Sequence, residues 1–564
     1  TSGGGDLLSI EVSPANATLN WTGLPLSQSY TATGTYEDGS TATLTDVVFT
    51  LDADGTRLGA FAAEDFTVSG EAAGKGGVFA TTGEITGSTS VIVTVHPVRL
   101  GPGVPADGAD KFPDVSPPGA LSPTVVYPLD KAVMPTSVKS PNVQWEGAAT
   151  TNDLFRVRMI AGFATIDTIL AQAPGFTSSS QLSVSDWQIL INSASGGEIS
   201  VSVDHWDPTT GAQGGAAVDL KLIRGDITGA IYYWNLGAGR MERIDTAGRA
   251  LAIQNPPPRP GDGQRCIACH SVSKDGRYLS GSLWDAGQQG AVFDMSNPSV
   301  VTADPAPTLA PLSTTTYTQL FSTFNHDATR LMLNVGNSLT LIDPRNGATV
   351  PTNGTPLPAT GSSHPSWSPD GTLIAYVNNH NGASWAVDYT AGDLAVLPSS
   401  AGDTFGPPTT LVSSAAAGAA FAAPSWPTFS PDSAWIAYGA GVNSRGRNNG
   451  IPATYPGALF VINKAGGTTQ RLDVACAAAR DCYLPNFSPY DMGEHFWLVF
   501  YSFRSYGNAL AGTKGTSRRQ MWITAIDKSK LGTADASSVP YWVPDQDVAT
   551  ENMSAFWAPP PPIQ

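Results

Sequence analysis

The chain has 564 residues, more than the roughly 100–200 of an ordinary domain, and this length predicts several domains. It carries 30 Lys and Arg against 47 Asp and Glu, and the net charge of −17 argues against a nucleic-acid partner and against docking on an anionic lipid surface. Glycine (59) and proline (44) are abundant and only 14% of residues are charged, which is typical of all-β chains with many turns. No apolar run reaches the roughly 18 residues of a membrane span.

Residues 1–5 (Thr-Ser-Gly-Gly-Gly) have the composition of a flexible tether and lack an initiator methionine. Such a start is typical of a mature N-terminus after export, and it resembles the tether that follows the lipidated cysteine of bacterial lipoproteins. An N-terminal lipid anchor and an arbitrary boundary of the sequence both explain it, and the two interpretations stay open here.

Residues 6–98 alternate between apolar and polar positions in short runs, for example Leu8–Val12, Tyr30–Tyr36 and Val91–His96. About six such runs with turns between them predict a β-sandwich. The opening Leu-x-Ser-Ile-x-Val-x-Pro and the segment Ala32–Ser40 resemble the bacterial Ig-like domain. That resemblance implies a spacer or adhesion module, and self-assembly through such domains is an open alternative.

Residues 99–120 are rich in glycine and proline and are predicted to be a linker. Asp107, Asp110 and Asp114 offer three carboxylates at short spacing, and oxygen is the ligand that Ca²⁺ prefers. The regular spacing of a calcium loop is missing, so a solvated linker is favoured over a Ca²⁺ site.

Residues 121–228 form a second strand-rich block. The predicted strands are Val143–Gly147, Leu154–Ile160, Trp187–Ile191, Ile199–Trp206 and Val218–Leu222. The Pro128-x-Asp and Trp145 pattern resembles a fibronectin- or Ig-like domain, which makes this block the second predicted sandwich.

From residue 229 onward a unit recurs, namely Ser-Pro-Asp-Gly followed by an alternating apolar strand. The copies are Trp367–Tyr376, Phe429–Tyr438, Val272–Ser280, Phe324–Leu333 and the distorted Phe487–Ser502. The Pro-Asp-Gly step makes a tight turn, and units of roughly 40–60 residues with four strands predict propeller blades. The repeat resembles that of TolB-like propellers with WD-type Pro-Asp repeats, over about residues 229–560.

One blade is divided between the two ends of this region. Residues Ala230–Asp245 have the sequence of the second half of a blade, and Met553–Trp557 is a strand without a blade of its own. Pairing the two closes the ring and removes exposed strand edges. The whole chain is therefore predicted to be all-β, with two Ig-like sandwiches before a six-bladed propeller at residues 229–564; seven blades are the alternative.

Cys266-Ile-Ala-Cys269-His270 is the attachment signature of c-type haem. Two thiols at this spacing both reach the vinyl groups of one porphyrin, and the adjacent His270 becomes the proximal iron ligand. A thioredoxin-type pair requires a βαβ context, which is missing, and a structural zinc site requires a second ligand pair nearby. The motif predicts one covalent haem in an irregular loop at residues 255–272.

Haem c is attached outside the bacterial cytoplasm. Together with the Ig-like resemblance, the motif predicts an exported bacterial protein that is periplasmic, outer-membrane-anchored or extracellular. In an oxidising compartment Cys476 and Cys482 predict a local disulfide, with free thiols or a bridge to a partner as the alternatives.

The sixth iron ligand decides the function, because a filled site transfers electrons and an open one binds small molecules. Met553 is favoured, since it begins the closing strand beside the motif. The stretch Pro544–Trp557 also resembles the tail of haem-bearing members of this propeller group, which often have a His at this position. Met492 and His495 are the alternates, and an open site is a further one.

Other histidines and methionines are weaker candidates. Met295 and His326 lie in the predicted propeller, as do His364 and His380. These last two flank one blade and could line a mouth of the ring, but turn or surface positions are favoured for them. His96 and His205 belong to the predicted sandwiches, where a lone histidine is most often structural.

Three functions follow from this organisation. The first is electron transfer by a mono-haem c-type cytochrome that docks a redox partner protein or a small-molecule electron donor or acceptor. The second is a haem enzyme with an open distal site that acts on peroxide or a small nitrogen compound. The third is a binding or structural module in which the haem only holds a loop.

Overall fold

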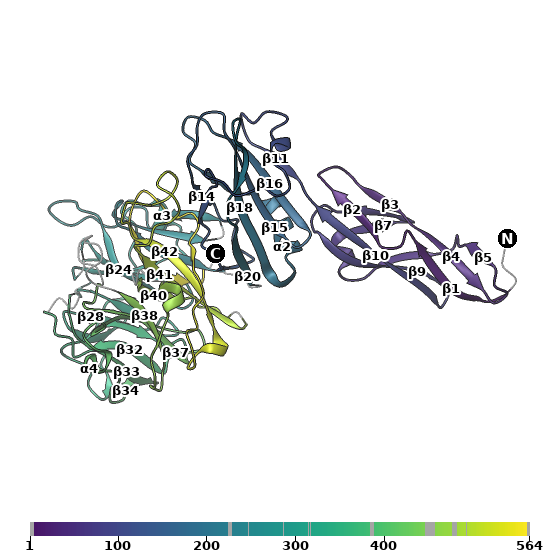
Figure 1. Cartoon of the computed structure of the whole chain (residues 1–564). Coiled ribbons are helices and arrows are strands. Elements are labelled where there is room, and N and C mark those ends of the chain that lie inside the picture. Colours follow the sequence, from purple (N-terminus) through teal and green to yellow (C-terminus); the bar gives the residue numbers. More distant parts are fainter. Residues whose placement is uncertain are drawn as a thin grey trace. The chain divides into compact units, whose positions relative to one another are not determined.

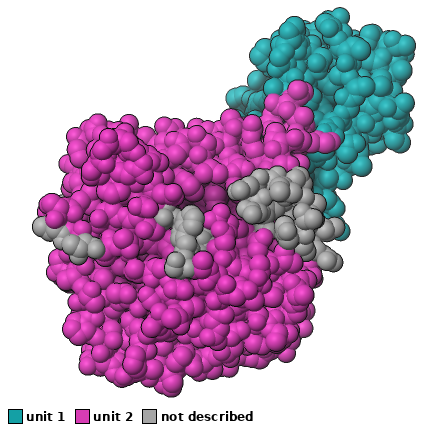
Figure 2. All heavy atoms as spheres, turned by 90° about the vertical axis from the view of Figure 1, so that its left-hand side faces the viewer, with its two compact units in different colours: residues 1–224 teal, residues 225–564 magenta. Residues whose placement is uncertain are grey.

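The computed structural model describes residues 5–223, 228–245, 247–285, 287–313, 315, 317–383, 388–445, 457–476, 482–491 and 493–560. The chain is nearly all β and divides into two compact units, residues 1–224 and 225–564 (Figures 1 and 2). The predicted start of the propeller at residue 229 lies close to this division.

Unit 1 is built around an eleven-stranded sheet with two smaller sheets in its first block and one in its second. The strands of the first block are β1 (Leu7–Ser13), β2 (Ala17–Trp21), β3 (Ser27–Ser29), β4 (Thr31–Tyr36), β5 (Thr41–Thr43), β6 (Val48–Leu51), β7 (Gly59–Ala62), β8 (Asp65–Val68), β9 (Gly74–Thr82) and β10 (Ile85–Val95), with the short helix α1 (Gly55–Leu58). Alternate residues of β10 such as Val91 and Val93 are fully buried, as the period-two pattern predicted.

The second block continues the same sheet rather than starting a separate one. Its strands are β11 (Val98–Leu100), β12 (Thr124–Tyr127), β13 (Ala132–Pro135), β14 (Val143–Glu146), β15 (Leu154–Ala161), β16 (Ala164–Ala171), β17 (Ser179–Ser180), β18 (Glu198–Asp207), β19 (Gly211–Gly214) and β20 (Val218–Ile223). Strand β16 pairs in parallel with both β10 and β11. The two blocks are therefore joined by backbone hydrogen bonds.

The predicted linker at residues 99–120 packs against the second block. Strand β11 joins the sheet, a 3₁₀ turn η1 covers Ala109–Lys111, and Phe112 is buried against Leu154 and Ile169. Asp107 pairs with Lys111 at 2.7 Å, and no cluster of three acidic, histidine or cysteine side chains suited to a metal occurs in the described ranges.

One predicted strand is wrong. Residues Val184–Ser193 form helix α2 instead of the strand expected at Trp187–Ile191. Ser183 caps the helix by accepting a hydrogen bond from the Asp186 N–H, a Ser-x-x-Asp start signal that outweighs the short apolar run. Trp187 and Leu190, three residues apart, bury one face of the helix.

The two sandwich histidines pair with buried carboxylates. His205 lies 2.9 Å from Asp153, and His96 lies 2.9 Å from Asp167, which also accepts hydrogen bonds from Arg158. Burial acts to raise the pKa of Asp167, but the hydrogen bonds from Arg158 and His96 outweigh it and lower the pKa to about 2. These contacts are structural.

Asp167→Asn is expected to lower the free energy of unfolding of unit 1 by about 3 kcal/mol at neutral pH, because it removes one partner of a buried ion pair. In the wild-type protein, the free energy of unfolding should fall by roughly 2 kcal/mol between about pH 4 and about pH 2. The reason is that Asp167 takes up its proton at a higher pH in the unfolded chain than in the folded protein. Chemical unfolding at several pH values measures both. Asp54→Asn, in an exposed pair, is the control; an equal loss in both variants would contradict the assignment.

Unit 2 has a β-propeller architecture, with six sheets among its described residues. These are β44–β21–β22–β23, β24–β25–β26, β27–β28–β29, β31–β32–β33 with β30, β34 and β35, β36–β37–β38–β39, and β40–β41–β42–β43. The inner strands contact one another in a closed cycle: β44, β24, β27, β31, β36, β40 and back to β44.

The bounds of the strands in unit 2 agree with the repeat. They are β21 (Ala230–Asn235), β22 (Arg240–Asp245), β23 (Gly248–Leu251), β24 (Ile267–Val272), β25 (Tyr278–Leu283), β26 (Gly290–Asp294), β27 (Ser322–Phe324), β28 (Leu331–Val335), β29 (Ser338–Ile342), β30 (Asn353–Gly354), β31 (Ser363–Trp367), β32 (Leu373–Asn378), β33 (Asp393–Ser400), β34 (Thr404–Phe405), β35 (Thr409–Val412), β36 (Ala423–Phe429), β37 (Trp435–Gly441), β38 (Ala458–Asn463), β39 (Gln470–Arg471), β40 (Cys482–Phe487), β41 (His495–Ser502), β42 (Gln520–Asp527), β43 (Tyr541–Trp542) and β44 (Asn552–Ala558). Between them lie α3 (Ser299–Thr302), α4 (Ser414–Ala417), α5 (Asp473–Cys476) and the 3₁₀ turn η3 (Lys528–Lys530).

The Ser-Pro-Asp-Gly step forms the predicted turn in each clear copy. Ser368 donates to Asp370 at 2.6 Å and accepts from the Leu373 N–H at 3.0 Å, while Gly371 has a φ of +74°. The serine thus ties the end of β31 to the start of β32, and glycine provides the left-handed conformation that other residues adopt at a cost.

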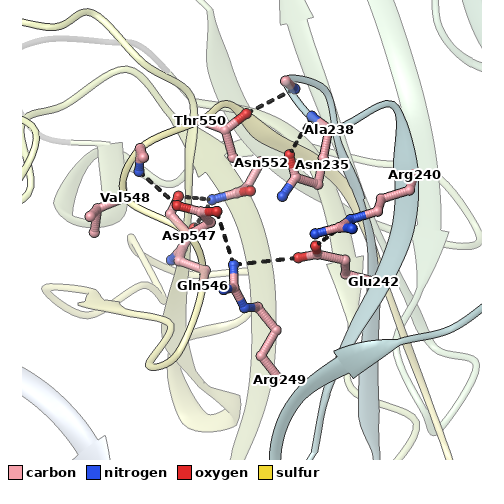
Figure 3. A network of polar contacts seen from close by, with 12 residues as sticks. Asn235, Ala238, Arg240, Glu242, Arg249, Gln546, Asp547, Val548, Thr550 and Asn552 are labelled. Carbon is pink, nitrogen blue, oxygen red and sulfur yellow. Dashed lines mark hydrogen bonds and ion pairs between the residues drawn. The ribbon is translucent and has the colours of Figure 1, made fainter.

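The ring closes as predicted, because β44 pairs antiparallel with β21. The loop before β44 is held by a polar network (Figure 3) in which Arg249 lies 3.1 Å from Asp547 and 3.7 Å from the buried Glu242. Tyr233 also donates to Glu242, and Thr550 accepts a hydrogen bond from the Gly237 N–H.

Glu242→Ala is expected to lower the free energy of unfolding of unit 2 by about 3 kcal/mol and to speed proteolytic release of the C-terminal strand. The reason is that it leaves the buried Tyr233 hydroxyl and the Arg240 guanidinium without their acceptor and removes one of the two carboxylates beside Arg249. Thermal unfolding and limited proteolysis measure the effect. Arg345→Ala, which breaks an exposed pair with Asp343, should change the free energy of unfolding by no more than about 1 kcal/mol. Equal effects of the two variants would argue against the closure network.

Candidate functional site

Five of the six inner strands, all except β27, share a break in their register. Strands β24, β31, β36 and β40 each lose regular pairing at one step, and β44 does so against β21. The residue at this step has a positive φ in every one of them: Cys269 (49°), His364 (49°), Trp426 (49°), Leu484 (48°) and Ser554 (57°). A left-handed backbone is costly for these residue types, so its repetition marks a feature that the architecture requires.

The breaks surround one cavity of about 420 Å³, within the roughly 300–1,000 Å³ of small-molecule and cofactor sites. All six sheets contribute to its wall. The residues at corresponding positions are Cys269, Phe321, His364, Trp426, Leu484 and Ser554.

The structure brings Cys269, His270 and Met553 into the wall of this cavity. Cys266 is not among the lining residues, but its thiol interacts electrostatically with that of Cys269. The carboxylate of Asp285 raises the pKa of both thiols. The motif therefore stands at the cavity with both thiols close to one another.

Part of the predicted motif loop is a strand. Residues 255–266 are irregular as expected, but β24 begins at Ile267 and carries both Cys269 and His270. The break between Ala268 and Ser271 explains the difference, because it lets a strand present adjacent side chains as a loop would.

The alternates to Met553 lie elsewhere. His495 begins β41, opposite Asp527, and does not line the cavity. Met492 lies outside the described residues. Met295 packs in an apolar core, and His326 is exposed.

The two thiols are held in the neutral form. Burial, then the nearby Asp285, raises the pKa of Cys269 to about 12, and the same two causes raise the pKa of Cys266. Neither thiol has the lowered pKa of a nucleophilic or redox-active cysteine.

His270 faces the cavity with both ring nitrogens free of hydrogen bonds of normal geometry. Burial lowers its pKa to about 4, and the nearby backbone of Tyr232 opposes the shift only in part. The ring is therefore neutral at physiological pH, which is the form that binds a metal ion.

His364 lies in β31 and is 3% exposed, so the prediction of a turn or surface position is wrong for it. His380 follows the end of β32 but is only 6% exposed, so it is not a surface residue. Only His364 of the two lines the cavity. Its ring lies 4.2 Å from that of Phe321 and 3.8 Å from that of Trp426, between centroids. The repeat could have predicted this position, because His364 lies six residues before Asp370, just as Cys269 lies six residues before Asp275.

Basic side chains also line the cavity. Arg445 pairs with Asp388 at 2.8 Å and Arg519 pairs with Glu551, but Lys274 has no carboxylate partner among the described residues. Burial lowers the pKa of Lys274 to about 8. An unpaired ammonium group in such a wall favours an anionic ligand group.

Cys476 and Cys482 are both buried, and they are free thiols in this structure. Burial and the neighbouring Cys476 thiol raise the pKa of Cys482. The two are thus neighbours without the predicted disulfide bond, and oxidation of the pair stays a prediction.

The described residues fit a covalent haem. The thiol of Cys269, a neutral histidine with unbonded nitrogens, a cation without a carboxylate partner among the described residues and aromatic side chains all line one cavity, and Cys266 lies three residues before Cys269. The donor set suits a porphyrin, whose iron needs axial nitrogen or sulfur and whose propionates need cations.

No protein-family model and no curated protein matches the sequence. Among solved structures, the chain is similar to one from a nidogen–laminin complex (9% identity, TM-score 0.35, 58% of this chain and 98% of the other) and to a putative TolB from Agrobacterium tumefaciens (16%, 0.30, 57% and 100%). It is also similar to the dihydro-heme d1 dehydrogenase NirN in complex with DHE (13%, 0.29, 54% and 53%). These likenesses concern the fold alone.

Within the described part of the chain, no helix is long and apolar enough to cross a membrane.

In the variant Cys266→Ala/Cys269→Ala, the melting temperature is expected to rise between pH 8 and pH 10. The folded pKa of Lys274, about 8, lies below its usual 10.5, so the unfolded chain binds more protons in this window and stability increases with pH. Adding Lys274→Met should flatten the rise, whereas adding Lys464→Met, an exposed partner of Asp370, should not. Identical pH profiles for the two added substitutions would contradict the lowered pKa of Lys274.

Proposed function

We propose that the protein is an exported mono-haem c-type cytochrome in which the cavity of unit 2 holds the haem. Cys266 and Cys269 attach it, and His270 is one axial ligand of its iron. The observation that carries the proposal is the placement of Cys269 and His270, with its unbonded ring nitrogens, at a cavity built by all six sheets.

The six sheets are, in this proposal, the blades of a six-bladed TolB-like ring. The two blocks of unit 1 are Ig-like modules of an exported bacterial protein, whose location is periplasmic, outer-membrane-anchored or extracellular. A disulfide between the neighbouring Cys476 and Cys482 fits such an oxidising compartment.

When bound, the haem supplies a one-electron couple between Fe(III) and Fe(II). The residues of the chain do the rest. Phe321 and Trp426 exclude water from the cavity, His270 donates a neutral nitrogen, and Lys274 offers a cation for a propionate. An apolar wall and fixed ligands keep the surroundings unchanged between the two charge states, which favours electron transfer with a redox partner.

Export of the wild-type chain together with a haem c attachment system is expected to yield a red protein with one haem per chain, measured as the pyridine haemochrome. Cys266→Ala and Cys269→Ala should each weaken attachment, and the double variant should abolish covalent haem on a denaturing gel. Cys476→Ala/Cys482→Ala is the matched control and should retain full haem content. A colourless wild-type protein would overturn the proposal.

The same sample separates electron transfer from small-molecule chemistry. A low-spin spectrum, indifferent to CO after reduction, together with a reversible redox titration, supports a cytochrome. Ready binding of CO would favour an enzyme with an open distal site.

A further inference from the structure

We infer that His364, rather than Met553, supplies the second axial ligand in the cavity, on the opposite side of the haem from His270. This inference rests on the proposed haem site. It comes from the hydrogen bonds of His364, which decide which of its ring nitrogens carries the proton.

The tautomer of His364 is fixed by a chain of two hydrogen bonds. The Tyr389 hydroxyl donates its single proton to the Pro424 carbonyl at 2.6 Å, and the same hydroxyl lies 3.0 Å from Nδ1 of His364. Since the hydroxyl proton is already used, Nδ1–H must be the donor to Tyr389. Nε2 of the neutral ring then keeps its lone pair.

Nε2 is the atom that the protein leaves without a partner. It is buried and makes no hydrogen bond among the described residues. His364 is among the residues that line the cavity, whereas Tyr389, which holds Nδ1, is not. Metal-bound histidines have this arrangement, in which one nitrogen binds the metal and the other donates to an oxygen that fixes the ring.

The ring is also held in place by packing. The rings of His364, Phe321 and Trp426 contact one another, and Cys269 packs against the pair formed by Leu320 and Phe321. The motif cysteine and His364 therefore both lie beside the Leu320–Phe321 pair, which supports a place for His364 next to a haem attached through Cys269.

Met553 is less well placed for this role. Strand β44 lies directly beside β24 in the cycle of inner strands, whereas β31 is separated from β24 by β27. Met553 also packs against the cluster of Tyr483, Leu484, Tyr501 and Phe503. β31 is therefore farther round the ring from β24 than β44 is, which favours His364 over Met553 for a ligand on the side of the cavity away from His270.

The test uses the haem-loaded full-length protein. His364→Ala is expected to convert a low-spin ferric spectrum to a high-spin one and to allow CO binding, and added imidazole should restore the low-spin spectrum. His380→Ala is the matched control, since His380 is buried with an unbonded Nε2 but lies outside the cavity wall. Both His380→Ala and Met553→Ala should keep the wild-type spectrum.

His364→Met serves as a second variant if the alanine variant folds poorly. It should remain low-spin and show a higher reduction potential, because thioether sulfur favours Fe(II). Tyr389→Phe should shift the potential while leaving the spin state unchanged.

Two failures are distinguishable. A wild-type protein without covalent haem overturns the proposed function and the ligand assignment together. A haem-loaded protein whose spectrum is unchanged by His364→Ala, or lost in Met553→Ala, overturns only the assignment of His364.

Discussion

The pairing of β44 with β21 is the interaction on which the rest of unit 2 depends. It joins residues more than 300 positions apart, and it makes the last strand of the chain the inner strand of the first sheet. Without it β21 would keep an open edge, and the cavity would lose the wall that carries Met553–Phe556. Closure therefore creates the site as well as stabilising the ring.

At the register break of the inner strands, the backbone conformation is shared while the side chain that it carries varies. A regular strand would turn alternate side chains toward its neighbours, whereas the positive φ at Cys269, His364 or Trp426 turns one side chain toward the cavity. The same backbone conformation recurs in five of the six sheets, but the residue at the position differs. The same backbone conformation thus places a thiol, an imidazole and an indole in the wall of one cavity.

The sequence predicted what is local and periodic. The Ser-Pro-Asp-Gly turns and the apolar strands after them recur visibly, and the unpaired strand at Met553–Trp557 pointed to closure. Helix α2 was missed because a five-residue apolar run fits a strand or a helix equally well, and only the Ser183 cap decides between them. The packing of residues 99–120 depends on distant partners such as Leu154, which no local pattern reveals.

The same limit applies to the site. Cys266, Cys269 and His270 form a short motif that is recognisable in the sequence. The role proposed for His364 depends instead on hydrogen bonds that involve Tyr389 and Pro424, which lie 25 and 60 residues further along the chain. Its burial follows from tertiary packing between Phe321 and Trp426, so a histidine beside a Pro-Ser step looked like a turn residue.

The balance of polar groups in the cavity argues for a bound group rather than an empty space. A buried polar atom without a partner costs about 1–3 kcal/mol, and the described wall contains such atoms on His270 and His364 together with the unpaired ammonium of Lys274. Water could bond to the nitrogens, but it would leave the ammonium without a countercharge. A porphyrin carries a central metal ion and peripheral carboxylates, and it covers the aromatic walls between them. One ligand of this kind offsets all of these costs at once, which is why we favour it over water or a simple anion.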